Sequence, residues 1–211
     1  MTMFVVVEGL DGAGTTTQTH EVAEALRRQG VEVVTTREPS DGPVGRMIRE
    51  MIGMRETLPG GRAVGRSTLA LLFAADRLYH VEAEIEPELE AGKVVISDRY
   101  VASSLAYQGD VEGGDVDYGW VREVNRRARR PDLTVFLRAE AQLCLDRLSG
   151  REERDLFETR EKLERLVARY DEVMAMLSEE GEAVLELDAR RSVGELTEAI
   201  VGALRERMGQ G

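Results

Sequence analysis

The fold of this chain is decided close to its start, by the stretch Phe4-Val5-Val6-Val7-Glu8-Gly9-Leu10-Asp11-Gly12-Ala13-Gly14-Thr15-Thr16-Thr17. Residues 4–7 are apolar, mostly β-branched and without helical period, which indicates a strand buried on both faces. Three glycines then interrupt the chain, and residues 16–28 have the apolar spacing of an amphipathic helix. A buried strand, a glycine-rich loop and a helix in this order are typical of loops whose backbone N–H groups bind phosphate.

The glycine-rich segment matches the phosphate-binding pattern G-x-x-x-x-G-K-[ST] at all but one defined position. Gly9 and Gly14 have the required spacing, and Thr16 occupies the hydroxyl position that usually meets Mg²⁺. Thr15, however, stands where the lysine is expected. From this segment alone, a glycine-rich turn that opens a helix with a threonine cap is the alternative interpretation.

Outward from this segment, short apolar strands alternate with helices. Strands are predicted at 4–7, 31–36, 93–97, 133–137 and 183–187. Helices are predicted at 16–28, 44–54, 67–90, 117–128, 140–149, 158–178 and 193–208, the third of them broken or kinked near Pro87. This alternation predicts an α/β fold with a five-stranded parallel sheet and helices on both faces. Because ligands bind beyond the carboxyl ends of such strands, segments 8–17, 37–43 and 98–108 are expected to meet in one cleft.

The composition bounds the class of protein. With 211 residues we predict a single domain over 1–211 with a substantial core. The net charge of −12, from 28 basic and 40 acidic residues, argues against a nucleic-acid partner. No apolar run reaches the length of a membrane helix and no signal-peptide pattern is present, so we predict no membrane contact and a cytoplasmic location. The single cysteine, Cys144, excludes an internal disulfide and is predicted to lie in the core.

Five further segments place polar residues at strand ends or on a helix. They are Thr36-Arg37-Glu38-Pro39, Leu71-Leu72-Phe73-Ala74-Ala75-Asp76-Arg77, Ser97-Asp98-Arg99-Tyr100, Ser103-Ser104-Leu105-Ala106-Tyr107-Gln108-Gly109 and Arg130-Pro131-Asp132-Leu133-Thr134. Together with residues 8–14, these segments resemble the thymidylate kinase family, whose members phosphorylate dTMP to dTDP. The resemblance runs from residue 4 to about residue 188. It implies a phosphate-loop kinase fold with a small mobile lid at about 150–158, ATP and dTMP as substrates, Mg²⁺ as cofactor, and a homodimer.

On the donor side, the resemblance implies that ATP contacts the loop, the start of the next helix and one arginine that packs on adenine. These residues are Gly9, Leu10, Asp11, Gly12, Ala13, Gly14, Thr15, Thr16, Thr17 and Arg147. Thr16 and Asp98 would organise Mg²⁺, although Asp98 could instead cap a helix that begins near Val101. Arg151 and Arg154 of the lid would close on the donor phosphates, with a solvated, charge-mixed loop as the alternative.

On the acceptor side, the resemblance implies a set of residues that contact dTMP. They are Asp11, Arg37, Phe73, Arg77, Arg99, Ser103, Tyr107 and Gln108. Arg37 and Arg99 follow strand ends and can fork onto the monophosphate, unless they form surface ion pairs with a neighbouring acid. Asp11 would lie near the sugar 3′-hydroxyl and the transferring phosphate, although it could also only stabilise the loop.

The base would be recognised by side chains of two helices. Phe73 would stack on thymine, although its helical position also fits a core residue. Arg77 lies four residues further on the same helical face and can donate to a base carbonyl. Gln108 can donate and accept at the carbonyl and N–H edge of thymine, and Tyr107 would lie against the deoxyribose. Ser103 joins this set, with a helix-capping role as its alternative.

The missing loop lysine leaves three functions open. An active dTMP kinase would use Asp11, Asp98, Arg99, Arg151 and Arg154 as catalytic residues, with Arg151 and Arg154, or less favourably Arg138, supplying the absent cation. A related kinase would act on dUMP or a deoxynucleoside. A catalytically weak nucleotide-binding protein would need no cation at Thr15.

Overall fold

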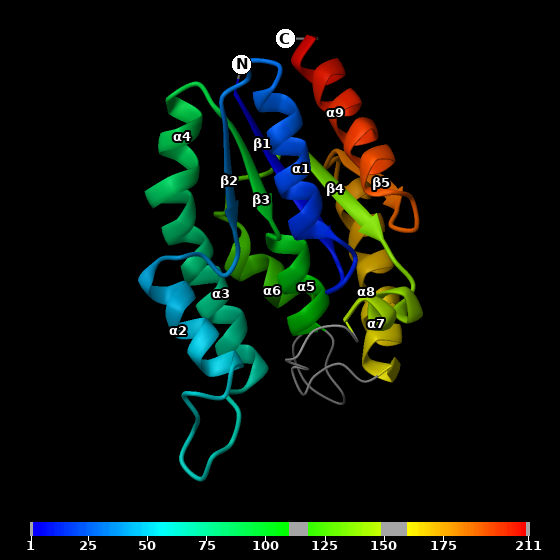
Figure 1. Cartoon of the computed structure of the whole chain (residues 1–211). Coiled ribbons are helices and arrows are strands. Elements are labelled where there is room, and N and C mark those ends of the chain that lie inside the picture. The colour runs from blue at the N-terminus through cyan, green and yellow to red at the C-terminus, as the bar shows by residue number, and fades with distance from the viewer. Residues whose placement is uncertain (1, 110–117, 149–159, 210–211) are drawn as a thin grey trace.

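The computed structural model describes residues 2–109, 118–148 and 160–209. Five parallel strands form one sheet in the order β2-β3-β1-β4-β5 (Figure 1). Their bounds are β1 Met3–Gly9, β2 Val33–Arg37, β3 Val94–Asp98, β4 Leu133–Arg138 and β5 Val184–Asp188. The predicted five-stranded parallel sheet is confirmed, since the ends of every strand lie within two residues of the predicted ends.

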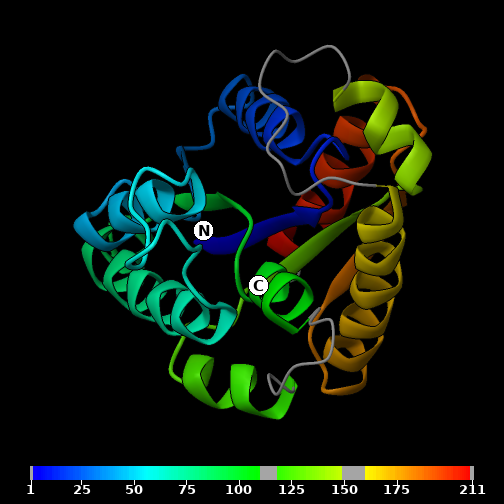
Figure 2. The same ribbon diagram turned by 90° about the horizontal axis from the view of Figure 1, so that it is seen from below.

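Helices cover both faces of this sheet. Their bounds are α1 Thr15–Arg27, α2 Pro43–Ile52, α3 Arg66–His80, α4 Glu86–Glu90, α5 Val101–Gly109, α6 Tyr118–Asn125, α7 Ala141–Leu148, α8 Arg160–Glu179 and α9 Val193–Gly209. Seen from below, α1 and α9 lie on one side of the sheet, and α5 and α8 lie on the other (Figure 2). Within the described part of the chain, no helix is both long and apolar enough to cross a membrane.

The helix predicted at 67–90 is divided as Pro87 requires. A π-helical turn, Val81–Ile85, joins α3 to α4. Pro87 has no amide hydrogen, and its ring would collide with the carbonyl four residues earlier in a regular α-helix. The wider π-helical turn contains Ala83, whose carbonyl is the one that would collide.

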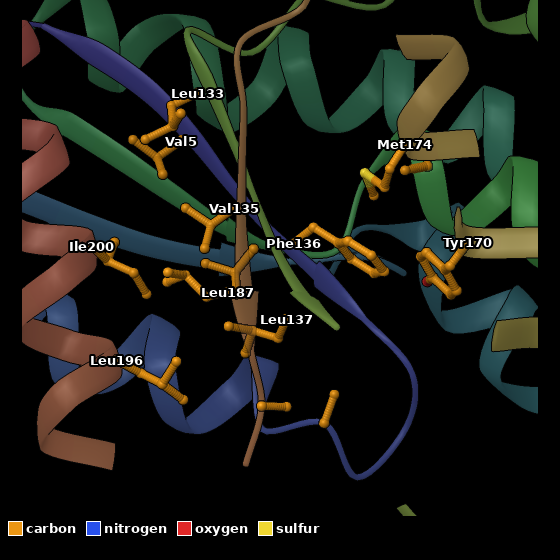
Figure 3. Packing of buried hydrophobic residues seen from close by; sticks show 14 of the residues in the cluster. Val5, Leu133, Val135, Phe136, Leu137, Tyr170, Met174, Leu187, Leu196 and Ile200 are labelled. Carbon is orange, nitrogen blue, oxygen red and sulfur yellow. The ribbon is translucent and has the colours of Figure 1, made fainter. Parts of the chain in front are cut away.

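The core follows the alternation of side chains along β1 and its neighbour β4. Val5, Leu133, Val135 and Leu137 point toward α9, whereas Phe136 points to the opposite face (Figure 3). On that opposite face Phe136 stacks against Tyr170 of α8 with ring centroids 5.6 Å apart. Cys144 is fully buried in the same core, as predicted.

The carboxyl ends of three neighbouring strands meet as predicted. Val7, Asp98 and Arg37 occupy one row of the sheet register. Just beyond this row, the Arg99 amide donates to the Val7 carbonyl at 2.9 Å, and the Glu38 amide donates to the Asp98 carbonyl at 3.0 Å. The three polar segments that follow these strands therefore border the same cleft.

Candidate active site

The glycine loop, residues 9–14, is shaped by backbone conformations that only glycine adopts easily. Gly12 and Gly14 have φ angles of 87° and 104°. A Cβ on Gly12 would also lie 2.9 Å from the Cys144 carbonyl oxygen, so the loop packs directly on α7. Helix α1 begins at Thr15, and no side chain in the described part of the protein caps its end at Gly14. The first N–H groups of α1 therefore remain available to an anion such as phosphate.

Arg147 of α7 fastens the outer side of the glycine loop. Its Nη1 donates to the carbonyl oxygens of Gly12 and Ala13, both at 3.1 Å, and its Nη2 donates to the Ala189 carbonyl at 2.9 Å. These three bonds tie the loop to α7 and to the segment after β5. Arg147 thus lies beside the glycine loop, and its contact with ATP stays a prediction.

Thr16 and Asp98 lie together at the floor of the cleft. The Thr16 hydroxyl donates to Asp98 Oδ2 at 2.5 Å, joining the first turn of α1 to the end of β3. Asp98 Oδ1 is buried and has no hydrogen-bond partner. The carboxylate therefore bonds Thr16 and not the first turn of α5, so the capping alternative for Asp98 does not describe this structure. A hydroxyl beside an unsatisfied carboxylate oxygen is a donor set that suits a hard cation.

Arg99 and Asp11 form the centre of the cleft. Arg99 Nη2 donates to Asp11 Oδ1 at 2.5 Å, and Tyr107 donates its hydroxyl to Asp11 Oδ2 at 3.1 Å. The Arg99 guanidinium also lies over the Tyr107 ring, 5.5 Å from its centroid. Burial lowers the pKa of Arg99, but the Asp11 carboxylate together with the nearby Tyr107, Tyr170 and Glu8 side chains outweighs it, so the pKa is raised. Arg99 is thus a permanent cation between the glycine loop and the cavity described next.

That cavity, called here the Phe73 cavity, has a volume of about 470 Å³ and runs between α3, α5 and α8. Phe73, Arg77, Arg99, Ser103, Tyr107 and Gln108 all line it. Phe73 is only partly buried and belongs to neither buried apolar cluster, so it is a cavity wall and not core. Gln108 Oε1 is buried without a partner. The cavity offers an aromatic face together with polar groups that lack partners, the usual composition of a ligand pocket.

Arg77 is held more tightly than its sequence position indicates. It is fully buried, and its Nε and Nη2 donate to Glu38 Oε2 at 2.9 and 2.6 Å. Nη2 also donates to the Ser104 hydroxyl at 2.9 Å, and Nη1 donates to Asn125 Oδ1. Most of its N–H groups are therefore committed to protein partners, although the side chain still borders the Phe73 cavity.

His80 extends this buried network. Its Nδ1 lies 3.4 Å from Glu38 Oε1, and its Nε2 lies 3.4 Å from Glu84 Oε2 and 2.7 Å from the Thr36 hydroxyl. Burial would lower the pKa of His80, but the hydrogen bonds with Glu38 and Glu84 outweigh it and raise the pKa to about 9. A charged His80 and Arg77 thus share the single carboxylate of Glu38 beneath one wall of the cavity.

Two of the sequence-predicted arginines point elsewhere in this structure. Arg37 is exposed and pairs with Asp41 at 2.9 Å, so it does not line the Phe73 cavity. Arg138 forms a two-bond pair with Asp171, at 2.9 and 2.7 Å, on the outer side of α8. Arg151 and Arg154, with the lid predicted at about 150–158, lie outside the described residues.

A second cavity, of about 390 Å³, lies between α5, α6 and β4 and is rich in arginine. Its arginines are largely matched by acids, since Arg126 pairs with Glu123 at 2.7 Å and Arg129 pairs with Glu86 at 2.9 Å. The Phe73 cavity is therefore the better candidate for a substrate.

Sequence reasoning missed three residues at the site. Glu38 anchors Arg77, Glu8 lies buried beneath Ser103, and Tyr170 reaches the site from α8. A charged residue in a buried strand is itself a signal, because burial without partners is costly, and Glu8 carries that signal. Tyr170 follows the core spacing of its helix, so only its hydroxyl distinguishes it from neighbouring apolar residues.

The comparisons with known proteins agree on one family. A family model described as thymidylate kinase matches residues 7–200. The chain is 39% identical over 210 residues to a Thermococcus gammatolerans protein named "Probable thymidylate kinase", covering 99% of this chain and 98% of that protein. It is 41% identical over 206 residues to a Pyrobaculum calidifontis protein of the same name, covering 98% and 97%.

Proposed function

The chain belongs to the thymidylate kinase family, and on that premise we propose that it transfers the γ-phosphoryl group of ATP directly to the phosphate of dTMP. Phosphorylation of dTMP is the activity of the family as a whole, whereas the donor, the metal and the in-line step are specific to the proposal. The observation that carries it is the position of Arg99 and Asp11, which separate an uncapped helix N-terminus from the Phe73 cavity.

In the proposed complex, the ATP phosphates lie on the glycine loop and the α1 N-terminus. The dTMP monophosphate lies at the inner end of the Phe73 cavity, where Arg99 contacts it. Asp11 shares the Arg99 guanidinium and the Tyr107 hydroxyl, so it fixes both groups near the two reacting phosphates. Phosphoryl transfer needs positioned cations more than covalent chemistry, and this arrangement supplies one at the point of transfer.

The residues present fit a magnesium ion. Thr16 Oγ1 and the partnerless Asp98 Oδ1 lie at the end of the glycine loop, and Mg²⁺ prefers one or two protein oxygens together with phosphate oxygens. These two residues would hold it, and the ion would neutralise charge on the donor phosphates. Among the described residues, no group of three His, Cys, Asp or Glu side chains could hold a metal without such substrate ligands.

For the base, we propose stacking on Phe73 and hydrogen bonding to Gln108. Gln108 Oε1 lacks a partner in the cavity wall and can accept from the thymine N3–H. Arg77 would act mainly by shaping the pocket through Glu38. Nη1 donates to Asn125, and its second N–H would be the one that donates to a base carbonyl. Phe73→Ala should weaken dTMP binding by about 1–3 kcal/mol and leave ATP binding nearly unchanged, as calorimetry with each ligand would measure.

Thr15 leaves the donor phosphates without the usual lysine. Within the proposal, Arg151 and Arg154 supply that charge, and Arg138 is the weaker candidate because it already pairs with Asp171. Single replacement of Arg151 or Arg154 by Ala should then lower turnover at least about tenfold. The Thr15→Lys substitution should partly rescue the more damaged variant, whereas strictly additive effects would show that these arginines do not replace the lysine.

The activity itself is tested by ADP release, coupled to a spectroscopic readout, with saturating ATP and Mg²⁺. We expect turnover with dTMP, less with dUMP, and none with thymidine. Arg99→Ala should lower kcat at least about tenfold while thymidine affinity changes less than about twofold, because the phosphate is its partner. An inactive wild type that still binds both nucleotides would favour the nucleotide-binding alternative.

We further propose that two copies pair through α2 and α3. Met47, Leu71 and Tyr79 of these helices are 45, 51 and 43% exposed, and pairing would remove this apolar surface from water. Sedimentation should show a dimer for the wild type and a monomer for Leu71→Glu. A wild type that sediments as a monomer at micromolar concentration would contradict the pairing.

A further inference from the structure

The backbone of Arg99 is held in an uncommon conformation. Its φ angle is 73°, in the left-handed region that side-chain-bearing residues rarely adopt. The Arg99 amide donates to the Val7 carbonyl at 2.9 Å, and the Ser97 hydroxyl donates to the Arg99 carbonyl at 2.8 Å. Such a conformation persists only where surrounding contacts enforce it, and it aims the guanidinium back across the cleft toward Asp11.

Glu8 holds the chain that immediately follows Arg99. Its side chain is fully buried at the end of β1, and Oε1 accepts from the amides of Tyr100 and Ser103 at 2.8 and 3.2 Å. These amides belong to the start of α5, so a carboxylate from a distant strand caps this helix. Oε2 accepts from the Ser103 hydroxyl at 2.7 Å. The groups that bond Glu8 are all donors, which suits an ionised carboxylate. Burial raises the pKa of Glu8, and the hydrogen bonds from Ser103 and the nearby Arg99 charge oppose that rise.

Tyr170 connects the same group to the guanidinium. Its hydroxyl lies 2.8 Å from the Ser103 hydroxyl and 3.4 Å from Glu8 Oε2. Arg99 Nη1 donates to that phenol oxygen at 3.2 Å and to the Ser103 hydroxyl at 3.1 Å. Burial raises the pKa of Tyr170, so the phenol stays protonated and can donate as well as accept. Its ring is held independently by stacking on Phe136.

We propose that Glu8 and Tyr170 are positioning residues that fix the Arg99 guanidinium where the acceptor phosphate binds. They hold Nη1 of the Arg99 guanidinium and the start of α5. The other nitrogen, Nη2, donates to Asp11 and faces the cleft. Neither residue touches the proposed substrates, so both act through Arg99 and Ser103. The inference rests on the proposed function of Arg99. The experiments below distinguish failure of the positioning role from failure of that function.

The test measures kcat and KM for dTMP. It also measures the dissociation constant of thymidine divided by that of dTMP, called here the affinity ratio, which isolates the contribution of the phosphate contact. Glu8→Gln keeps the shape but turns an accepting oxygen into a donor that faces other donors. It should lower kcat at least about tenfold, and Tyr170→Phe should lower it about three- to tenfold. Both variants should lower the affinity ratio while thymidine binding changes less than about twofold. In the Arg99→Ala background neither substitution should change the ratio further.

Two matched variants control for nonspecific effects. Tyr118→Phe removes a partly buried phenol that also bonds an arginine and a glutamate, Arg169 and Glu172, but at the start of α6. Glu182→Gln neutralises a half-buried acid far from the cleft, whose pKa burial also raises. Both should keep kcat and the affinity ratio within about twofold of the wild type.

A purely structural role would lower the unfolding temperature and weaken all ligands alike, which would overturn the inference. If Glu8→Gln does not fold, Tyr170→Phe decides alone, because its ring packing is retained. An affinity ratio that falls in Arg99→Ala but not in Tyr170→Phe overturns the positioning role and leaves the proposed function standing. A ratio unchanged in Arg99→Ala overturns both.

Discussion

The two halves of the cleft are built by different means. The donor half consists of backbone: positive φ angles at Gly12 and Gly14, and the uncapped start of α1. The acceptor half consists of buried side chains, where Glu38 joins Arg77 and His80. Backbone geometry tolerates changes in charge but not in shape, whereas a buried ionic network tolerates neither an unpaired charge nor a lost proton.

The difference between the two halves is tested most directly by a substitution of Glu38. In Glu38→Gln, the fully buried Arg77 loses its anion, and an uncompensated buried charge costs about 3–5 kcal/mol. We expect urea unfolding to report a loss of that size, with dTMP binding weakened more than ATP binding. Asp41→Asn removes an acid of the exposed Arg37 pair and should change stability by less than about 1 kcal/mol. A tolerated Glu38→Gln would mean that the acceptor half does not depend on this ion pair.

The acceptor half should also depend on pH through His80. The pKa of His80 is about 9 in the folded protein, against an ordinary value of 6.5. Because the pKa is higher in the folded state, the charged His80 contributes its full stabilisation of the fold below pH 6.5. This stabilisation is lost as the pH rises through 9. The loss should be about 3 kcal/mol between pH 6.5 and 10, measured by urea unfolding. His80→Gln should lack this slope, and equal slopes in both proteins would exclude a charged His80.

The donor half should respond to shape at Gly12. Gly12→Ala requires an L side chain at φ 87° and places its Cβ 2.9 Å from the Cys144 carbonyl. We expect a loss of about 2 kcal/mol in unfolding free energy and weaker ATP binding. Gly30→Ala shares the positive φ of 81° but meets nothing within 4 Å, so it should lose about 1 kcal/mol and keep ATP affinity. Equal effects of the two substitutions would show that packing on α7 does not matter.

The smallest effect is expected at Arg147. Arg147→Ala removes the bonds to the Gly12 and Ala13 carbonyls, which should weaken ATP binding by about 1 kcal/mol and leave dTMP binding unchanged. Calorimetric titration with each nucleotide would measure this. Arg126→Ala, at the exposed pair with Glu123, should leave both affinities unchanged. Equal weakening of ATP and dTMP by Arg147→Ala would mean that the two halves are not independent.

The difference between a half built from backbone and a half built from buried side chains also determines which features could be predicted from the sequence. The strand ends, the glycine loop and the meeting of the three polar segments follow from periodicity and glycine spacing, and the structure confirms them. Phe73 and Gln108 lie on the cavity wall, and their contacts with dTMP stay predictions. Arg77 differs: its helical spacing indicates the correct face, but not that its N–H groups are committed to Glu38 and Asn125.

The amino-acid sequence by itself determined the parallel α/β sheet, the glycine loop between a strand and a helix, and the resemblance to one kinase family. These are local properties, because a strand, a turn or a helix depends on residues a few positions apart. Only the tertiary structure decided that Glu8 caps α5 and that Tyr170 reaches Arg99. Those contacts join residues separated by 92 and 71 positions, and such pairings depend on how the helices pack on the sheet. Burial then makes each pairing obligatory, since a polar group removed from water must find its partner inside the fold.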